Sequence, residues 1–166
     1  FSGFRGRIGS VAFSPDGAHL AACDATGRVL VWDVTERRVS HRHTLHAGES
    51  NLVLFVADGE LAVGGIGTIS LWRLEADGTL ICRQRFRGHS AEIEDLQRHP
   101  TLPLLASAGS DGAVRLWNIQ TGESVAVWRN PGPYWGTNIH GVRGLTSAQR
   151  ANLLALGAVE ETVQQR

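Results

Sequence analysis

Apolar and polar residues alternate along most of this chain in short runs, and turns rich in glycine, proline and aspartate separate the runs. Three of the runs are alike, because each starts with glycine and ends with tryptophan, at 27–32, 67–72 and 112–117. Alternation with a period of two residues, together with many β-branched and aromatic residues, is typical of antiparallel β-strands. The pattern therefore predicts an all-β fold built from repeats.

The repeats have a regular spacing. Trp32, Trp72 and Trp117 stand 72 − 32 = 40 and 117 − 72 = 45 residues apart. The first and third repeats align without a gap at an offset of 117 − 32 = 85 residues, and the second aligns once two residues are deleted before Leu61, which puts Phe55 opposite Phe13. A period of roughly 40–45 residues is typical of the four-stranded blades of a β-propeller. We therefore expect tandem blades, each unable to bury its own face alone.

The first and third repeats each divide into four predicted strands. These are 8–14, 19–23, 28–34 and 39–45 in the first repeat and 93–99, 104–108, 113–119 and 124–128 in the third. After Trp128 the pattern weakens, although 153–157 is similar to the strand 104–108, and 147–156 also has a helical apolar period. We expect blades at about 1–46, 47–88 and 89–131 and a partial fourth blade at about 138–166.

Two short motifs mark the ends of the third repeat, Gly88-His89 near its start and Trp117-Asn118 near its end, while the first repeat carries Trp32-Asp33. These motifs resemble the WD-repeat β-propeller family. The resemblance implies a buried hydrogen-bond tetrad in each blade, which by position is His89, Ser107, Asp111 and Trp117 in the third repeat. A buried indole N–H and a buried imidazole need partners in any case. The matching positions are Phe4, Ala22, Thr26 and Trp32 in the first repeat and His46, Ala62, Ile66 and Trp72 in the second, so we expect the third blade to be the most rigidly specified.

The length of the chain limits the number of blades that it can form. A propeller closes with roughly 4–8 blades, whereas 166 residues supply three blades and most of a fourth. The sequence contains no Met and opens in the middle of a repeat. We expect a piece of a longer protein with a seven-bladed ring, the usual size in the family. A four-bladed ring and a self-associating half-propeller are the alternatives.

Composition narrows the class of protein. The formal net charge is +0, which gives little electrostatic support to direct nucleic-acid binding. All 16 basic residues are arginine, which indicates either a surface for phosphate or carboxylate contacts or merely the base composition of the genome. No apolar run approaches the roughly 18 residues of a membrane span. Cys23 and Cys82 lie in predicted strands as small core residues, so we expect a reducing, intracellular compartment.

Three groups of residues invite a chemical function. His41, His43 and His46 could begin a metal site, but no carboxylate or cysteine at a suitable spacing completes one. Ser107, His89 and Asp111 have the residue types of a catalytic triad, but their positions in the repeat assign them to the structural tetrad. Glu92, Glu94 and Asp95 could resemble paired catalytic carboxylates. However, a position at the rim of a blade would explain Glu92 and Glu94 as charges exposed to solvent. The sequence therefore predicts no enzyme, no metal and no cofactor.

The surface offers candidates for partner binding instead. The connection 129–136 is longer than its counterparts and carries Arg129, Tyr134 and Trp135 beside two prolines. Aromatic and arginine side chains are frequent binding hot spots. Arg5 and Arg7, on the corresponding connection before the first blade, are expected on the same face. The alternative for Trp135 is that it caps the fourth blade.

A more specific likeness covers the third repeat. The segments 93–100, 115–121 and 125–128, together with 61–65, resemble the extra sex combs / embryonic ectoderm development family. The resemblance implies a non-catalytic, nuclear subunit of a Polycomb complex, which holds a histone methyltransferase and reads trimethylated lysine on a histone tail through an aromatic cage. Gly9 and Asn51 stand where two cage aromatics are expected. The alternative is an unrelated cytoplasmic or nuclear WD-repeat adaptor in ubiquitin ligation, ribosome assembly or an RNA-associated complex.

Overall fold

A computed structural model describes residues 3–45, 51–129, 134 and 137–160 of the chain. The chain divides into two compact units, Phe1–Trp128 and Arg129–Arg166. The described part of the first unit is an antiparallel β structure, as the alternating pattern predicts. Its strands are β1 (Ile8–Phe13), β2 (His19–Asp24), β3 (Arg28–Asp33), β4 (Arg38–Thr44), β5 (Leu52–Ala57), β6 (Glu60–Gly64), β7 (Ile66–Leu74), β8 (Leu80–Arg98), β9 (Leu104–Gly109), β10 (Ala113–Asn118) and β11 (Ser124–Arg129).

The strands form three consecutive meanders, which we call blades 1, 2 and 3. Blade 1 is the sheet β1-β2-β3-β4. Blade 2 consists of β5, β6, β7 and the first part of β8, and blade 3 consists of the last part of β8 followed by β9, β10 and β11. The eight strands predicted for the first and third repeats are all present, except that the strand at 93–99 is the end of a longer one.

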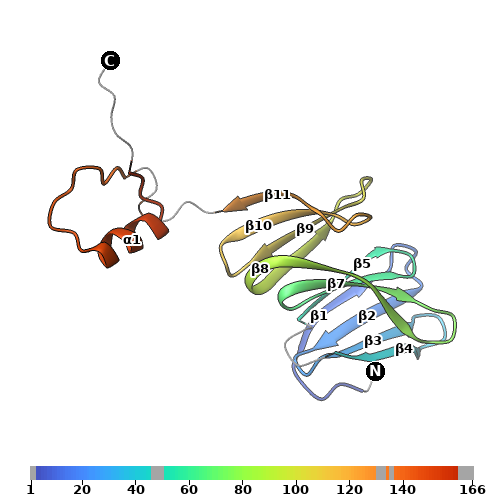
Figure 1. Cartoon of the computed structure of the whole chain (residues 1–166). Helices are drawn as coiled ribbons and strands as arrows, with labels where there is room; N and C mark the ends of the chain where they lie inside the picture. Colours follow the sequence, from blue (N-terminus) through green and yellow to red (C-terminus); the bar gives the residue numbers. More distant parts are fainter. Residues whose placement is uncertain (1–2, 46–50, 130–133, 135–136, 161–166) are drawn as a thin grey trace. The chain divides into compact units, whose positions relative to one another are not determined.

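Strand β8 joins blades 2 and 3 without a break. Its first half pairs with β7, and the stretch from Ile93 to Arg98 pairs with β9 (Figure 1). The expected boundary between 88 and 89 therefore falls inside one strand. The outer strand of blade 2 therefore continues directly into the first strand of blade 3, and the two blades belong to one seven-stranded sheet.

The three repeated tryptophans occupy equivalent places. Each lies on the third strand of its blade and pairs with a leucine on the second strand, namely Trp32 with Leu20, Trp72 with Leu61 and Trp117 with Leu105. All three indoles are buried. The internal repeat read from the sequence is therefore a structural repeat.

The core of the first unit lies between adjacent blades. We call the side of a blade that faces the blade before it the leading face, and the opposite side the trailing face. Val29 and Val31 of blade 1 pack with Phe55 and Trp72 of blade 2, and a second cluster joins blades 2 and 3 around Ile69. Burying one such side chain stabilises the fold by roughly 1.5–3 kcal/mol. Each core cluster is therefore built from residues of two adjacent blades.

The second unit differs from the expected fourth blade. Its described residues contain helix α1 (Ser147–Ala155) and an isolated parallel bridge between Asn138 and Val159. The stretch 153–157 is not a strand, although it is similar to the strand 104–108. The helical apolar period noted at 147–156 corresponds to α1. Thr146 and Gln149 form a capping box that starts the helix, and the following alanines and leucines favour helix. No helix in the described ranges is both long and apolar enough to cross a membrane.

Candidate docking end of the blades

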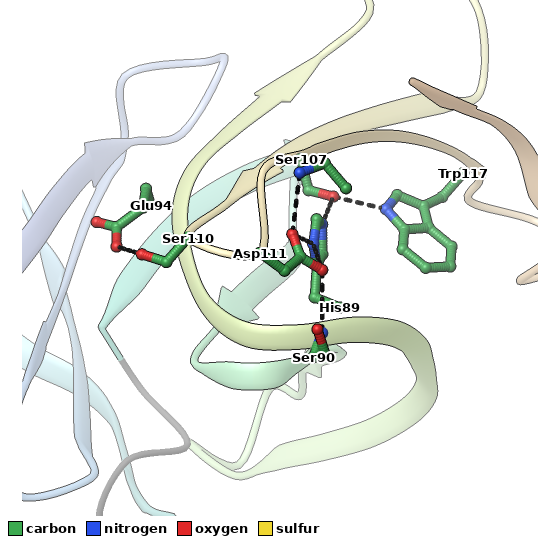
Figure 2. Close-up of polar contacts among 8 residues, drawn as sticks. His89, Ser90, Glu94, Ser107, Ser110, Asp111 and Trp117 are labelled. Atoms are coloured by element: carbon green, nitrogen blue, oxygen red, sulfur yellow. Dashed lines mark hydrogen bonds and ion pairs between the residues drawn. The ribbon is translucent and has the colours of Figure 1, made fainter. Parts of the chain in front are cut away.

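The four residues of the expected tetrad come together in blade 3 (Figure 2). The Nδ1 atom of His89 lies 2.9 Å from Asp111 Oδ1, and its Nε2 atom lies 2.7 Å from Ser107 Oγ. Trp117 donates its indole N–H to the same Ser107 oxygen at 2.8 Å. With the Nδ1–H tautomer, every donor in this chain has an acceptor. The four side chains are buried, so each bond replaces a contact with water that burial has removed.

Asp111 also fixes the backbone around it. Its two oxygens accept the backbone N–H groups of Ser90 at 3.0 Å and Ala113 at 3.1 Å. Burial alone would raise the pKa of Asp111, but the bonds from Ser90, His89 and Ala113 outweigh it and lower the pKa to about 2. The carboxylate thus ties β8, at Ser90, to the turn between β9 and β10.

In blade 1, Asp24 binds the backbone as Asp111 does in blade 3. Asp24, fully buried, accepts the backbone N–H groups of Arg5 at 3.0 Å, Gly6 at 3.2 Å and Arg28 at 3.1 Å, and it also holds Thr26. At the offset of 85 residues, Arg5 and Arg28 correspond to the Ser90 and Ala113 whose amides Asp111 binds. Burial again opposes ionisation, but the bond from Thr26 and the backbone amides hold the pKa of Asp24 well below its ordinary value.

The position of Asp24 corresponds to Gly109 in blade 3. A Cβ atom at Gly109 would lie 2.6 Å from His89 Nδ1 and 2.8 Å from Asp111 Oδ1, so only glycine fits beside the tetrad. In blade 1 the histidine is replaced by Phe4, which packs on Trp32 at 5.6 Å between ring centroids. The comparison of tetrad positions in the sequence missed Asp24. The signal was a carboxylate at the end of an apolar strand, where burial demands partners.

Blade 2 satisfies its tryptophan in a third way. Trp72 donates its indole N–H to Ser70 Oγ at 2.7 Å, from two residues earlier on β7. Ile66, in the place of the tetrad aspartate, is largely exposed. His46, in the place of the tetrad histidine, lies outside the described residues.

Hydrogen bonds and close contacts join the three blades at this end of the sheets. A Cβ atom at Gly9 would lie 2.5 Å from the backbone oxygen of Asn51, so blades 1 and 2 abut there. The side-chain amide of Asn51 donates to the Glu92 carboxylate, which connects the start of blade 2 to β8. Within blade 3, Ser110 donates to Glu94. We call this end, made of 5–9, 24–28, 64–68, 88–94 and 109–113, the pinned end, because Asp24 and Asp111 tie its loops together.

Opposite charges project from equivalent positions of the pinned end. The backbone oxygen of Arg7 accepts from Ala25 at 3.0 Å, and that of Glu92 accepts from Ser110 at 2.8 Å. Arg7 and Glu92 thus share one place in the repeat, and both side chains are exposed, as is Arg5. The pinned end is therefore basic on blade 1 and acidic on blade 3.

The other candidate partner-binding residues belong elsewhere in the chain. Arg129 is exposed at the end of β11, and Tyr134 is exposed in the second unit. Trp135 lies outside the described residues. The shared face expected for these residues and for Arg5 and Arg7 stays a prediction.

The histidines considered for a metal site have other contacts. His41 Nε2 lies 2.8 Å from the backbone oxygen of Glu75. The His43 ring packs at a tilt against Trp72, with 4.5 Å between the ring centroids. Burial lowers the pKa of His43. Within the described residues, no three His, Cys, Asp or Glu side chains gather in a way that could hold a metal ion.

A groove lies at the opposite end of blades 2 and 3. Two neighbouring cavities, of about 320 and 490 Å³, share Glu60, Ile119 and Gln120 in their walls. An ion pair of 2.8 Å between Arg83 and Glu60 crosses this region, and Leu102 is half exposed at its margin. Because Glu60 and Arg83 already pair with each other, this groove is a weaker candidate for recognition than the pinned end.

Comparison with known proteins agrees with the geometry. The WD domain, G-beta repeat family matches residues 1–33 and 80–118, which carry the tryptophans of blades 1 and 3. The chain is a WD-repeat protein. The unmatched stretch 34–79 covers most of blade 2, in which Trp72 binds Ser70.

Individual relatives show the same repeat. WD repeat-containing protein 55 of Pongo abelii is 33% identical over 67% of this chain and 29% of its own length. Striatin-4 of Mus musculus is 31% identical over 71% of this chain and 17% of its own length. The chain thus spans less than a third of these two relatives. The structure of U3-55K matches 78% of this chain and 41% of its own with a TM-score of 0.69 and 19% identity, which shows the fold alone. The computationally designed Ika4 protein matches 75% of this chain and 73% of its own, with a TM-score of 0.63 and 25% identity.

Proposed function

We propose that this WD-repeat chain is an intracellular, non-catalytic scaffold that binds a partner protein at the pinned end. The observation that carries the proposal is that Asp24 and Asp111 bind backbone amides at equivalent positions. Arg5 and Arg7 project from the segment before β1, and Glu92 projects from the equivalent stretch of β8. Loops fixed before binding lose little conformational entropy when a partner docks. The charges can then act from defined positions.

The charge pattern specifies the chemistry of the partner. Arg5 and Arg7 suit carboxylates, which a guanidinium binds through two parallel hydrogen bonds. Glu92 on blade 3 suits a basic side chain, and the exposed Ile66 beside it in the β7–β8 pairing offers an apolar contact. We therefore propose a partner segment that is acidic over blade 1 and basic over blade 3.

Affinity capture with charge-reversed variants tests the proposal. Protein carrying Arg5→Glu and Arg7→Glu should lose partners that the wild type retains. Arg37→Glu, in the exposed turn between β3 and β4 at the other end of blade 1, is the matched control and should retain them. Identical sets of captured proteins from all three samples would contradict docking at the pinned end.

The more specific candidate is the propeller subunit of a Polycomb histone-methyltransferase complex in the nucleus. Its support is the resemblance across blade 3. The relatives named above do not include a Polycomb protein, and they leave an adaptor of another complex as the alternative. Gly9 and Asn51, at two expected positions of the aromatic cage, touch each other, so this candidate does not include a cage built there. Co-purification of a histone methyltransferase would support the Polycomb candidate, and its consistent absence from captured nuclear complexes would favour the adaptor.

A further inference from the structure

Arg115 is a buried arginine in the middle of strand β10. Only 9% of its surface is exposed, and it pairs across the ladder with Ser107, as Trp117 pairs with Leu105. Side chains two residues apart on a strand share a face, so Arg115 lies with Trp117 on the leading face of blade 3. This face meets blade 2 in the core cluster around Ile69, so Arg115 lies between two blades that the structure describes.

The guanidinium of Arg115 has no counter-ion within the described part of the chain. Its Nε atom is buried there without a hydrogen-bond partner, and no described acidic side chain forms an ion pair with it. The tetrad carboxylate, Asp111, binds His89, Ser90 and Ala113 instead. Burying an unpaired charge is costly, and arginine stays protonated. Because water screens such a charge poorly, it attracts an anion more strongly than an exposed arginine does.

Two contacts hold this guanidinium in place. Its central carbon, Cζ, lies 5.7 Å from the centre of the Trp117 ring, which is a cation–π arrangement. A Cβ atom at Gly88 would lie 2.8 Å from Arg115 Nη1 and 3.1 Å from Cζ, so the guanidinium occupies the space that a side chain at position 88 would take. Gly88 itself is exposed, as is Arg87 directly before it on β8. The Nη1 end of Arg115 therefore lies against an exposed stretch of backbone in a basic part of the strand.

Blade 1 shows that the fold needs no charge at this position. The residue of blade 1 equivalent to Arg115, at the offset of 85 residues, is Leu30. The Leu30 Cδ1 atom lies 2.8 Å from the place of a Cβ atom at Gly3, and Gly3 is equivalent to Gly88. Leucine and arginine thus fill the same space beside a glycine. Since an apolar side chain is sufficient for packing here, the charge of Arg115 indicates a role other than packing.

We propose that Arg115 binds a small free oxyanion, such as inorganic phosphate, at its Nη end beside Gly88. The N–H groups of a guanidinium match the paired oxygens of such an ion. The positive charge is delocalised over the whole guanidinium, so an anion at the outer end also compensates the charge on the buried Nε atom. The ion is small because nine-tenths of the side chain is covered. Trp117 holds the guanidinium in position before the ion arrives, so little conformational freedom is lost on binding.

The variant Arg115→Leu separates anion binding from a structural role of the charge. It recreates the leucine–glycine contact of blade 1, and replacing a buried charge by an apolar residue is often neutral or stabilising. In buffer without phosphate, its urea midpoint should equal or exceed that of the wild type. A lower midpoint would show that the fold itself uses the guanidinium and would overturn the proposal. The site uses none of Arg5, Arg7 and Glu92, so its test is separate from that of docking at the pinned end.

Thermal unfolding of the 166-residue chain at increasing phosphate and constant ionic strength tests the binding. The midpoint of the wild type should rise with phosphate, since an ion that binds only the folded state stabilises it. Arg115→Leu should bind phosphate at least about tenfold more weakly, whereas the matched control Arg98→Leu, at an exposed position of β8, should respond as the wild type does. Equal responses of the three proteins, or none in any of them, would overturn the proposal. A loss in Arg98→Leu as large as in Arg115→Leu would overturn it as well.

Nuclear magnetic resonance reads the guanidinium directly and does not depend on the folding of a variant. The Nε–H resonance of Arg115, identified by its nuclear Overhauser contacts to the Trp117 ring, should shift and saturate over the phosphate range that raises the midpoint. A resonance that stays in place at all phosphate concentrations would overturn the proposal. Gly88→Ala is the second variant, because its methyl group would lie 2.8 Å from Nη1 and displace the guanidinium. It should also weaken phosphate binding at least about tenfold, and unchanged binding would contradict the placement of the site.

Discussion

Asp24 and Asp111 bind the backbone amides of equivalent residues although they stand two register positions apart in their blades. Asp24 takes the N–H groups of Arg5 and Arg28, and Asp111 takes those of Ser90 and Ala113. The two carboxylates therefore occupy the same place in their blades, although they come from different positions of the repeat. The family motif describes only one of these solutions.

Replacing Ser107 by alanine should destabilise blade 3. The substitution leaves the indole N–H of Trp117 and Nε2 of His89 buried without their shared partner, which costs on the order of 2 kcal/mol. Equilibrium urea unfolding measures the loss. Ser110→Ala, which removes only an exposed hydroxyl bonded to Glu94, should change the free energy of unfolding by less than about 0.5 kcal/mol. Equal effects of the two substitutions would contradict the role assigned to the tetrad.

The stability of the fold should decline in acid. Asp24 and Asp111 have pKa values depressed in the folded state, so their contribution is complete above the unfolded value of about 3.9 and is lost as the pH falls through the folded values. For Asp111, a folded pKa of about 2 corresponds to roughly 2–3 kcal/mol at neutral pH. Urea midpoints measured from pH 6 to pH 2 should fall most steeply below pH ~4 in the wild type and less steeply in Asp111→Asn. If the urea midpoints of the wild type and Asp111→Asn fell in parallel with pH, the contribution assigned to the Asp111 carboxylate would be contradicted.

The blade 1 arrangement should be transferable to blade 3. Gly109→Asp alone places a side chain against His89 and Asp111 and should be strongly destabilising. Combined with His89→Phe, Ser107→Ala and Asp111→Thr, it recreates the residues of blade 1 at these positions and should cost at least about 1 kcal/mol less than the sum of the single substitutions. Additive losses in chemical unfolding would show that the two arrangements are not interchangeable.

Gly9 should not tolerate a side chain. An added methyl group would lie 2.5 Å from the backbone oxygen of Asn51, and separating blades 1 and 2 to relieve the clash should cost roughly 1–3 kcal/mol. Adding Asn51→Gly to Gly9→Ala should not restore stability, because the nearest atom belongs to the backbone. Recovery of the thermal midpoint in that double variant would contradict this contact.

The sequence predicted the parts of the fold that the repeat itself encodes. The positions of Trp32, Trp72 and Trp117 and the eight strands assigned in repeats one and three follow from an offset that keeps equivalent residues in step. The four tetrad members follow instead from the resemblance to the WD-repeat family. At 147–157 the sequence shows both a helical apolar period and a likeness to the strand 104–108, and the capping box of Thr146 and Gln149 favours the helix. The sequence comparison missed Asp24. A residue-by-residue alignment compares side chains at fixed positions, whereas hydrogen bonding depends on where the carboxylate lies.

The pinned end is tested most directly by the affinity of a captured partner for matched charge variants, measured by titration calorimetry. The account predicts that Arg5→Glu combined with Arg7→Glu weakens binding at least about tenfold, a loss of about 1.4 kcal/mol, while Arg37→Glu binds as the wild type does. Unchanged affinity of the double variant, with loss instead in Leu102→Asp at the opposite groove, would place docking at the other end of the blades and contradict the account.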